Sequence, residues 1–147
     1  MSTAEAHLFP PGLYELSPDS WTAPFWDAAT EHRLVAPRCE QCGTFRMPPT
    51  PFCPDCRSQD TEWVGLSGRG SIYTFTVARH AVVPALKDSV PYVIAVVSLE
   101  GAGDARLITN IVGCQPEEVE IEAAVQVVWD DLTEATTVPR CVLATAG

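Results

Sequence analysis

The chain has 147 residues, which suits one compact domain or two small modules that share little interface. Its 9 basic and 19 acidic residues give a formal net charge of −10, and Lys87 is its one lysine. Because affinity for nucleic acids depends largely on lysine and arginine neutralising phosphates, this charge argues against a nucleic-acid partner.

The first residues, MSTAEAHLFPPGLYEL, lack the basic region and apolar run of a secretory signal, and no stretch has the roughly 18 apolar residues of a membrane span. We therefore expect a cytoplasmic protein with no membrane partner. In that reducing compartment, paired cysteines are more often metal ligands than disulfides.

The N-terminal part, residues 1–36, is predicted to be a tail followed by one short helix. Residues 1–17 are too apolar for an inert linker and too rich in proline and glycine for a helix, so we expect them to lie along a surface. Pro24 suits the first turn of a helix, and no proline or glycine follows it until Pro37. The pattern predicts a helix over about 24–32.

Two large aromatic residues stand at the start of this predicted helix. Phe25 lies on its apolar face, and Trp26 projects beside it. A helix this short cannot bury both rings within itself, so we expect them to pack on the rest of the protein or to contact a ligand or partner.

The stretch CEQCGTFRMPPTPFCPDC contains four of the chain's six cysteines, as two C-x2-C pairs. Zinc prefers four thiolates in a tetrahedron, and two such turns supply one complete shell with no open position for substrate. We predict a structural zinc ribbon over residues 37–66, with iron in a rubredoxin-like site as the rival. The predicted ligands are Cys39, Cys42, Cys53 and Cys56.

Basic and aromatic residues surround the cysteine pairs. A rigid metal-bound turn could direct arginines toward phosphates, and the rings beside them would suit either a nucleotide-bearing thioester such as coenzyme A or a protein partner. Simple solvation of the arginines is the alternative. The candidate contacts in this stretch are Arg38, Phe45, Arg46, Phe52 and Arg57.

The pattern of the remaining part, residues 67–147, predicts short strands and no long helix. Five strands in such a length predict a small Greek-key barrel of the OB type, and a split sandwich fits them almost as well. Pro139, within the last strand, suggests an edge position. The predicted strands cover residues 71–78, 92–99, 106–112, 124–130 and 136–143.

Groups outside the cysteine cluster form no catalytic pattern. Cys114 and Cys141 are expected to behave as small buried hydrophobes, and the three histidines match no ligand spacing. Asp130 and Asp131 are adjacent in a predicted turn, where they should point apart and solvate the turn. We therefore expect a protein without catalytic residues of its own.

The order of several motifs resembles a known family. PFWDAATEHRLVAPRCEQCG, FRMPPTPFCPDC, SGRGSIYTFTV, PYVIAVVSLEG and LITNIVGC follow one another as in the zinc-ribbon/OB-fold family of acyl-CoA-associated proteins. The resemblance runs from about residue 20 to residue 140, and the cysteine spacing alone would not select this family.

The resemblance implies a mainly β protein with a short N-terminal helix, a rubredoxin-like zinc ribbon and a C-terminal five-stranded OB barrel. It also implies a non-catalytic accessory subunit of a thiolase-superfamily enzyme, in a hetero-oligomer that binds acyl-CoA at a shared site. Relatives assist lipid-transfer-protein-type aldolases, which cleave steroid side-chain CoA esters by retro-aldol chemistry. The matching residues are the four cysteines, Phe25, Trp26, Thr109 and Asn110.

Two departures and two alternatives accompany this resemblance. The chain lacks the hydratase-like domain fused to some relatives, and its ending, PRCVLATAG, is less basic and aromatic than theirs. A ribbon and an OB barrel are also used to bind nucleic acids, and a rubredoxin-like site can carry electrons. We keep both functions as alternatives.

Overall fold

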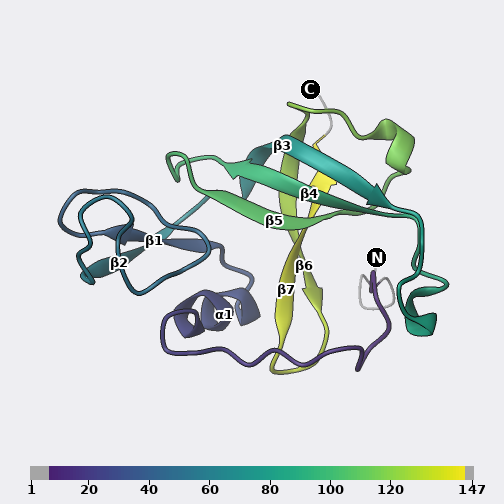
Figure 1. Ribbon diagram of the computed structural model, residues 1–147, viewed down its shortest axis with the longest axis horizontal. Coiled ribbons are helices and arrows are strands. Elements are labelled where there is room, and N and C mark those ends of the chain that lie inside the picture. The colour runs from purple at the N-terminus through teal and green to yellow at the C-terminus, as the bar shows by residue number, and fades with distance from the viewer. Residues whose placement is uncertain (1–6, 145–147) are drawn as a thin grey trace.

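A short helix, a two-stranded ribbon and a closed five-stranded barrel follow one another along the chain (Figure 1). The computed structural model describes residues 7–144. This architecture confirms the predicted fold class, and closure of the barrel shows that the split sandwich is wrong. The elements are α1 (Ala23–Thr30), β1 (Val35–Cys39), β2 (Thr61–Gly65), β3 (Arg69–Ala78), η2 (Pro84–Leu86), β4 (Tyr92–Leu99), β5 (Arg106–Ile111), η3 (Pro116–Glu118), β6 (Ala124–Asp131) and β7 (Thr137–Leu143).

The barrel strands are ordered β3-β4-β5-β7-β6, and β6 closes the barrel on β3. The long strand β3 pairs with both neighbours, and a bulge between Ile72 and Thr74 bends it from one to the other. Along β4, buried residues alternate with partly exposed ones, as expected for a strand with one face inside a barrel. Its inward residues are Val93, Ala95, Val97 and Leu99.

The expected edge position of Pro139 is wrong, because β7 lies between β5 and β6. Pro139 is paired with Trp129 of β6, whereas β5 pairs with β7 only at Ile111 and Cys141. Near Pro139 the hydroxyl of Thr109 donates a hydrogen bond to the proline carbonyl at 2.9 Å. The two strands diverge there, so a residue without an N–H is tolerated inside the barrel.

Helix α1 is shorter than the predicted range, because its helical residues end at Thr30. His32, two residues later, has a left-handed φ of 58°, which stops the helix. Phe25 is buried in the core shared with the barrel, and its ring meets that of Trp26 edge to face at 5.0 Å. Among residues 7–144, no helix is long and apolar enough to cross a membrane. The cytoplasmic location stays a prediction.

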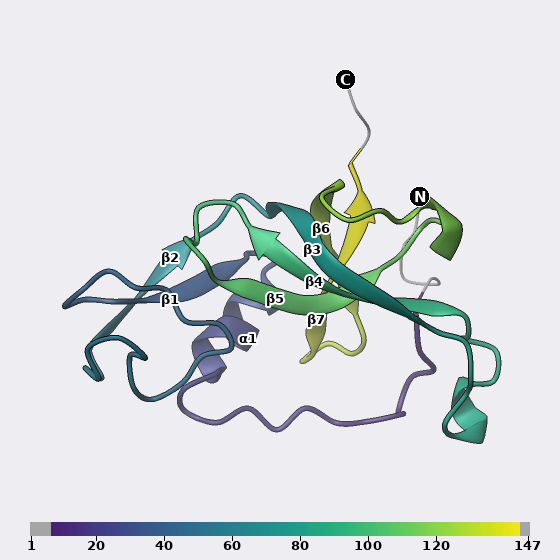
Figure 2. The ribbon, with the colours of Figure 1, turned by 45° about the horizontal axis from the view of Figure 1, so that its top comes forward.

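The ribbon, formed by β1 and β2, packs against one end of the barrel (Figure 2). Its two strands are antiparallel, and the Leu66 amide donates to the Leu34 carbonyl at 2.9 Å where the chain leaves the ribbon. Ribbon side chains, including Phe45, Met47 and Trp63, pack on the barrel core. Ribbon and barrel therefore share one core. The predicted domain limits, at residues 36 and 66, stay predictions.

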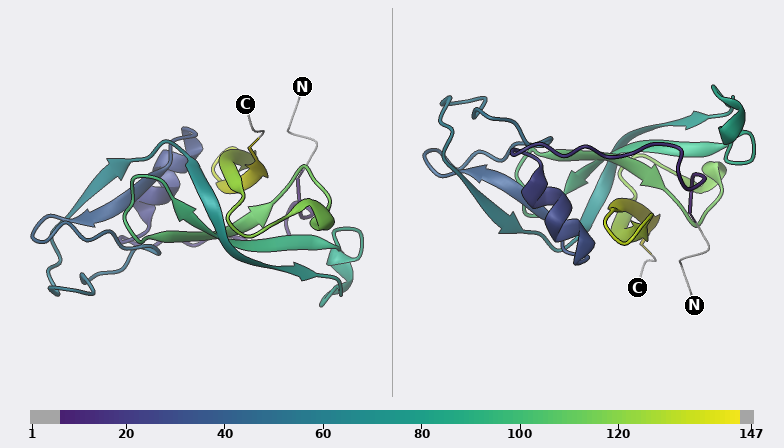
Figure 3. Two further views of the ribbon diagram at one scale, coloured as in Figure 1. Left: turned by 90° about the horizontal axis from the view of Figure 1, so that it is seen from above. Right: turned by 90° about the horizontal axis from the view of Figure 1, so that it is seen from below.

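The segment from residue 7 to residue 22, here called the strap, runs along the outside of the barrel to α1 (Figure 3). Phe9 anchors it, because the Phe9 ring meets the Tyr92 ring of β4 edge to face at 5.0 Å. The predicted surface path of the tail is thus confirmed from residue 7 onward, and residues 1–6 lie outside the described part.

Close approach of β3 and β4 requires a glycine at position 70. A Cβ atom at Gly70 would lie 2.4 Å from the Ser98 carbonyl oxygen, while one at Gly65 would meet nothing within 4 Å. We predict that Gly70→Ala lowers the free energy of unfolding by about 1–3 kcal/mol, because the backbones must move apart. Gly65→Ala should change it by less than about 0.5 kcal/mol. Urea unfolding of both variants tests this, and equal losses would contradict it.

Candidate metal centre and apolar groove

The two C-x2-C turns fold in the same way. In the first, the Cys39 amide donates to the Thr44 carbonyl at 2.8 Å, and the Gly43 amide donates to the Cys39 carbonyl at 2.9 Å. The second turn repeats both bonds at the same lengths, from Cys53 to Ser58 and from Arg57 to Cys53. The last residue of each turn is left-handed, with φ of 79° at Gly43 and 66° at Arg57.

These turns bring the four predicted ligand atoms together. All four cysteine sulfurs lie within 4.8 Å of one another, and the Cys39–Cys56 and Cys42–Cys53 pairs are each 3.5 Å apart. Bonds of about 2.3 Å from one tetrahedral metal ion would place sulfurs roughly 3.8 Å apart. The donor set therefore fits a single four-coordinate metal ion with no position left for substrate.

Backbone amides favour ionised sulfur in this cluster. The Cys42 amide holds the pKa of Cys39 below its usual value, and the Cys56 amide lowers the pKa of Cys53 to about 6. The Ser58 amide also favours ionised Cys56, but neighbouring sulfurs and burial raise the pKa of Cys56 to about 12. Four sulfurs this close cannot all be thiolates without a cation, so the cluster calls for a metal.

Three of the predicted contacts near the cysteines are used inside the fold. Arg38 forms an ion pair with Glu62 across the ribbon, and its guanidinium lies 5.7 Å from the centre of the Phe45 ring. Arg46 is only 4% exposed, and it donates to the Ser58 carbonyl and the Thr61 hydroxyl. Arg38, Phe45 and Arg46 therefore stabilise the ribbon, and Arg46 has little surface to offer a ligand.

Two of the predicted contacts remain on the surface of the ribbon. Phe52, between the two cysteine pairs, is 56% exposed, and Arg57, directly after the last ligand, is also exposed. Large exposed aromatic side chains are frequent in protein interfaces. The Arg38 side chain also stays 40% exposed, so Arg38, Phe52 and Arg57 are the residues of the predicted ribbon set that a partner or ligand can reach most easily.

The other predicted contacts lie together at a groove of about 500 Å³ on the outside of the barrel. Six segments form it: the strap, α1, the proline-rich loop of the ribbon, and the strands β4, β5 and β7. Most of its surface is apolar. Phe25, Trp26, Thr109 and Asn110 line it, together with Phe9, Tyr14, Leu16, Met47, Tyr92, Ile94, Ile108 and Arg140, among others.

A chain of hydrogen bonds forms the polar part of this groove. The Asn110 amide donates to the Val93 carbonyl at 2.9 Å and accepts from Nη1 of Arg140 at 2.8 Å. Nε of Arg140 donates to Asp130 at 3.4 Å, and the same carboxylate lies 2.5 Å from Nδ1 of His7. The network ties the strap to β4, β5, β6 and β7.

Sequence reasoning missed most of this network. The expectation that Asp130 and Asp131 both solvate a turn is wrong for Asp130, because both residues belong to β6, where Asp131 is exposed and Asp130 is buried. His7, one of the histidines that match no ligand spacing, is the partner of Asp130. One signal was available, because Arg140 is a charged residue in the middle of the apolar strand TVPRCVL.

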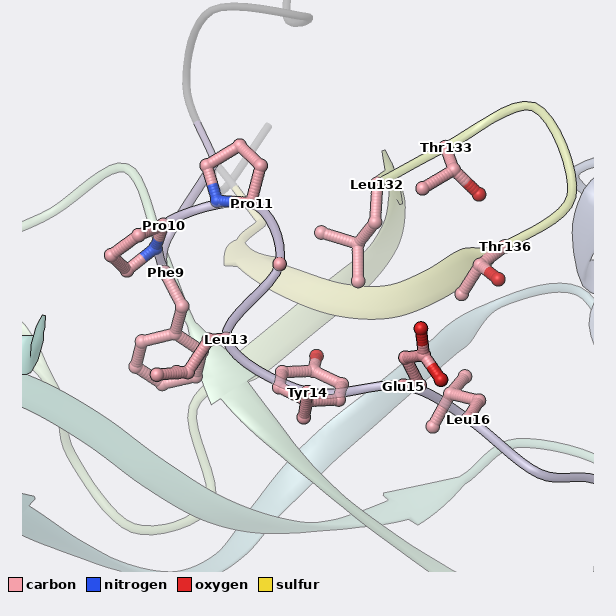
Figure 4. A pocket seen from close by; sticks show the side chains of 11 residues that line it. Phe9, Pro10, Pro11, Leu13, Tyr14, Glu15, Leu16, Leu132, Thr133 and Thr136 are labelled. Atoms are coloured by element: carbon pink, nitrogen blue, oxygen red, sulfur yellow. The ribbon is translucent and has the colours of Figure 1, made fainter.

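A second, smaller pocket of about 310 Å³ adjoins the groove between the strap and the turn from β6 to β7 (Figure 4). Phe9, Tyr14 and Leu16 line both cavities. Leu132 and Thr136 face the strap from the opposite side (Figure 4). The strap is thus bordered by cavities and contacts the barrel closely at His7 and Phe9.

Comparison with known proteins relates both modules to one family. Residues 26–62 match the profile "ChsH2, rubredoxin-like zinc ribbon domain", and residues 63–130 match "ChsH2, C-terminal OB-fold domain". A DUF35 domain-containing scaffold protein of Methanocaldococcus jannaschii is 35% identical over 125 residues, covering 84% of this chain and 86% of that protein.

Two longer relatives are named as hydratase subunits. A probable enoyl-CoA hydratase alpha subunit of Thermomonospora curvata is 43% identical over 117 residues, and these cover 78% of this chain but 35% of that protein. The 3-oxo-4,17-pregnadiene-20-carboxyl-CoA hydratase alpha subunit of Mycobacterium tuberculosis is 32% identical over 133 residues. These residues cover 90% of this chain and 41% of that protein. This chain therefore spans well under half of either protein.

A solved structure matches most of the chain. A chain of an Ltp2-ChsH2(DUF35) aldolase superposes with a TM-score of 0.78 at 37% sequence identity. The match covers 89% of this chain and 100% of that chain.

We predict that removing one sulfur abolishes metal binding. Cys53→Ser should reduce bound metal from one ion per chain to less than about a tenth of that, and should unfold the ribbon, since a structural metal contributes on the order of 10 kcal/mol to folding. Elemental analysis and thermal unfolding measure both effects. Cys114→Ser, outside the cluster, is the matched control and should keep its metal; equal metal content in the two variants would contradict the assignment.

Proposed function

The chain belongs to the ChsH2 (DUF35) family of zinc-ribbon and OB-fold proteins, and we propose that it is a non-catalytic accessory subunit of a thiolase-superfamily aldolase. One observation carries this proposal: 89% of the chain matches the whole length of a chain of an Ltp2-ChsH2(DUF35) aldolase. The scaffold name of the archaeal relative agrees with a supporting role. The partner then supplies the residues that perform carbon–carbon bond cleavage.

We propose zinc as the metal held by the four cysteines. The family name of the ribbon supports zinc over iron, and the four-sulfur donor set fits either metal. With its shell filled by protein sulfur, the ion has a structural role: it fixes the two turns and, through them, the ribbon surface that carries Phe52 and Arg57. The protein's contribution to the complex is then a rigid surface, not a reactive group.

The proposed substrate class is the CoA ester of a steroid side chain. Its support is the name of the Mycobacterium tuberculosis relative, which contains a steroid carboxyl-CoA. In this proposal acyl-CoA binds at a site shared with the partner. Arg57 is an exposed arginine beside the metal centre and is our candidate contact for a CoA phosphate.

Reconstitution tests the proposal. Tagged, zinc-loaded protein should co-purify from its source with a thiolase-like polypeptide, and retro-aldol cleavage of a steroid side-chain CoA ester should require that polypeptide. Turnover of a thioester by this chain alone would overturn the accessory role. So would the absence of any thiolase-like polypeptide from the purified, folded protein.

We predict that Phe52 lies in the partner interface. Phe52→Ser should weaken binding of the thiolase-like subunit at least about tenfold, or about 1.4 kcal/mol, because a buried aromatic anchor is lost. Tyr73→Ser is the matched control, since Tyr73 is 53% exposed but lies on β3 of the barrel. Surface plasmon resonance with the purified partner compares them. A larger effect of Tyr73→Ser would place the interface on the barrel instead.

A further inference from the structure

Residues 7–16 of the strap, here called the lid, are held to the barrel by few interactions. No residue of the strap is buried, and within residues 7–144 no backbone group of the lid is bonded to the barrel. Segments with few buried contacts and few hydrogen bonds open locally at a low cost in free energy. We propose that the lid opens on a hinge at Ser17 and Pro18, and that its opening joins the two cavities beside the strap.

A latch of two side chains closes the free end of the lid. Nδ1 of His7 lies 2.5 Å from the Asp130 carboxylate, and because a carboxylate only accepts, Nδ1 is the donor. Two residues later, the Phe9 ring meets the Tyr92 ring edge to face, and the Arg140 guanidinium lies 5.4 Å from the centre of the Phe9 ring. Opening therefore breaks one hydrogen bond and the contacts of one aromatic ring.

The other end of the lid joins a turn that is fixed to α1. The Asp19 carboxylate accepts from the Trp21 amide at 2.9 Å, and the Ala23 amide donates to the Asp19 carbonyl at 2.8 Å. Ser17 and Pro18, just before this turn, are exposed and make no hydrogen bond within the described part of the chain. Hinges are short segments of this kind, which absorb a change of backbone angles next to a fixed element.

Between latch and hinge, the lid contains a stiff turn. Residues 10–13, PPGL, are closed by a hydrogen bond of 3.3 Å from the last amide to the first carbonyl. Gly12, third in the turn, has the positive φ of 82° that a type II turn requires there. The two prolines restrict the backbone of the first half. Phe9 and Tyr14, on either side of the turn, therefore move together.

Opening of the lid changes the space that a ligand can use. Phe9, Tyr14 and Leu16 line both the groove of about 500 Å³ and the pocket of about 310 Å³, so the lid is the wall between them. Ile108 lines the groove, and Leu132 faces the lid across the smaller pocket (Figure 4). With this wall displaced, the two spaces form one elongated cleft. Its apolar lining suits an elongated, uncharged molecule that neither cavity holds in full.

Nuclear magnetic resonance measures the opening in the full, zinc-loaded chain. Cross-relaxation between the labelled rings of Phe9 and Tyr92 reports the closed lid, and relaxation dispersion gives the open fraction. We expect His7→Ala to raise the open fraction at least about fivefold, because a hydrogen bond to a charged group is lost. His7→Asn should restore the original fraction, since an asparagine amide nitrogen can occupy the place of Nδ1.

The matched control is His80→Ala, at an exposed histidine between β3 and η2, which should leave the open fraction unchanged. Equal open fractions in His7→Ala and the unchanged protein would overturn the latch, and so would a failure of His7→Asn to restore closure. No detectable opening in any variant would overturn the lid itself.

A rod-shaped fluorescent probe tests whether the cavities join. 1,6-Diphenylhexatriene is uncharged, so the net charge of −10 does not repel it, and it fluoresces in apolar surroundings. We expect one probe molecule to bind per chain, with an association rate that rises in His7→Ala by the same factor as the open fraction. An unchanged rate in this variant, or no binding to the folded protein, would overturn the role of the lid in admitting ligands.

Three serine variants locate the probe. Ile108→Ser in the groove and Leu132→Ser in the smaller pocket should each weaken binding at least about fivefold, because each removes apolar contact area. Ile121→Ser, at a residue 58% exposed between β5 and β6, should not. A loss in only one of the two cavity variants would overturn the joined cleft. These measurements need no partner, so their failure leaves the accessory role intact, and absence of a thiolase-like partner leaves the lid intact.

Discussion

Crowding of four sulfurs around one point is the constraint on which the ribbon depends. Without a cation the cluster would keep protons, because four thiolates this close repel one another, and the sulfur–metal bonds that tie the two turns together would be missing. The consequences reach beyond the ribbon. Met47 and the prolines after it form one wall of the groove, and Phe45 packs on the barrel core. The loop between the two cysteine pairs thus reaches from the metal site to the groove.

The second constraint is the strap, which buries charge on the outside of a barrel. A five-stranded barrel this small fills its interior with side chains such as Val97 and Ile72, so polar groups have to lie outside it. The strap covers some of them, and Asp130 and Arg140 consequently pair with each other and with His7. Charges that would otherwise be solvated are therefore buried and paired with one another.

Local patterns predicted the elements well, since strand alternation, turn residues and cysteine spacing are properties of neighbouring residues. They could not predict pairings between distant residues. His7 and Asp130 are 123 positions apart, and the residues around either one do not indicate that the two pair. Proximity in sequence also gave a wrong indication of which arginines are free to bind a ligand. Arg38 and Arg46 stand beside the cysteines in the sequence, but strand register pairs Arg38 with Glu62, and Arg46 donates to the Ser58 carbonyl at the second cysteine turn. The edge position predicted for Pro139 failed for a similar reason, because closure of the barrel places β7 between β5 and β6.

A scaffold can raise the rate of a reaction that it does not perform. Contacts with the part of a substrate that does not react can hold the reacting bond in the productive geometry, provided that the contacting surface is rigid. Here the metal makes the ribbon rigid, and the barrel network makes Arg140 rigid. The cysteine site and the hydrogen bonds of Arg140 to Asn110 and Asp130 provide this order, and no substrate is needed for it. A surface of this kind loses little entropy on assembly, which is the physical advantage of dividing support and chemistry between two chains.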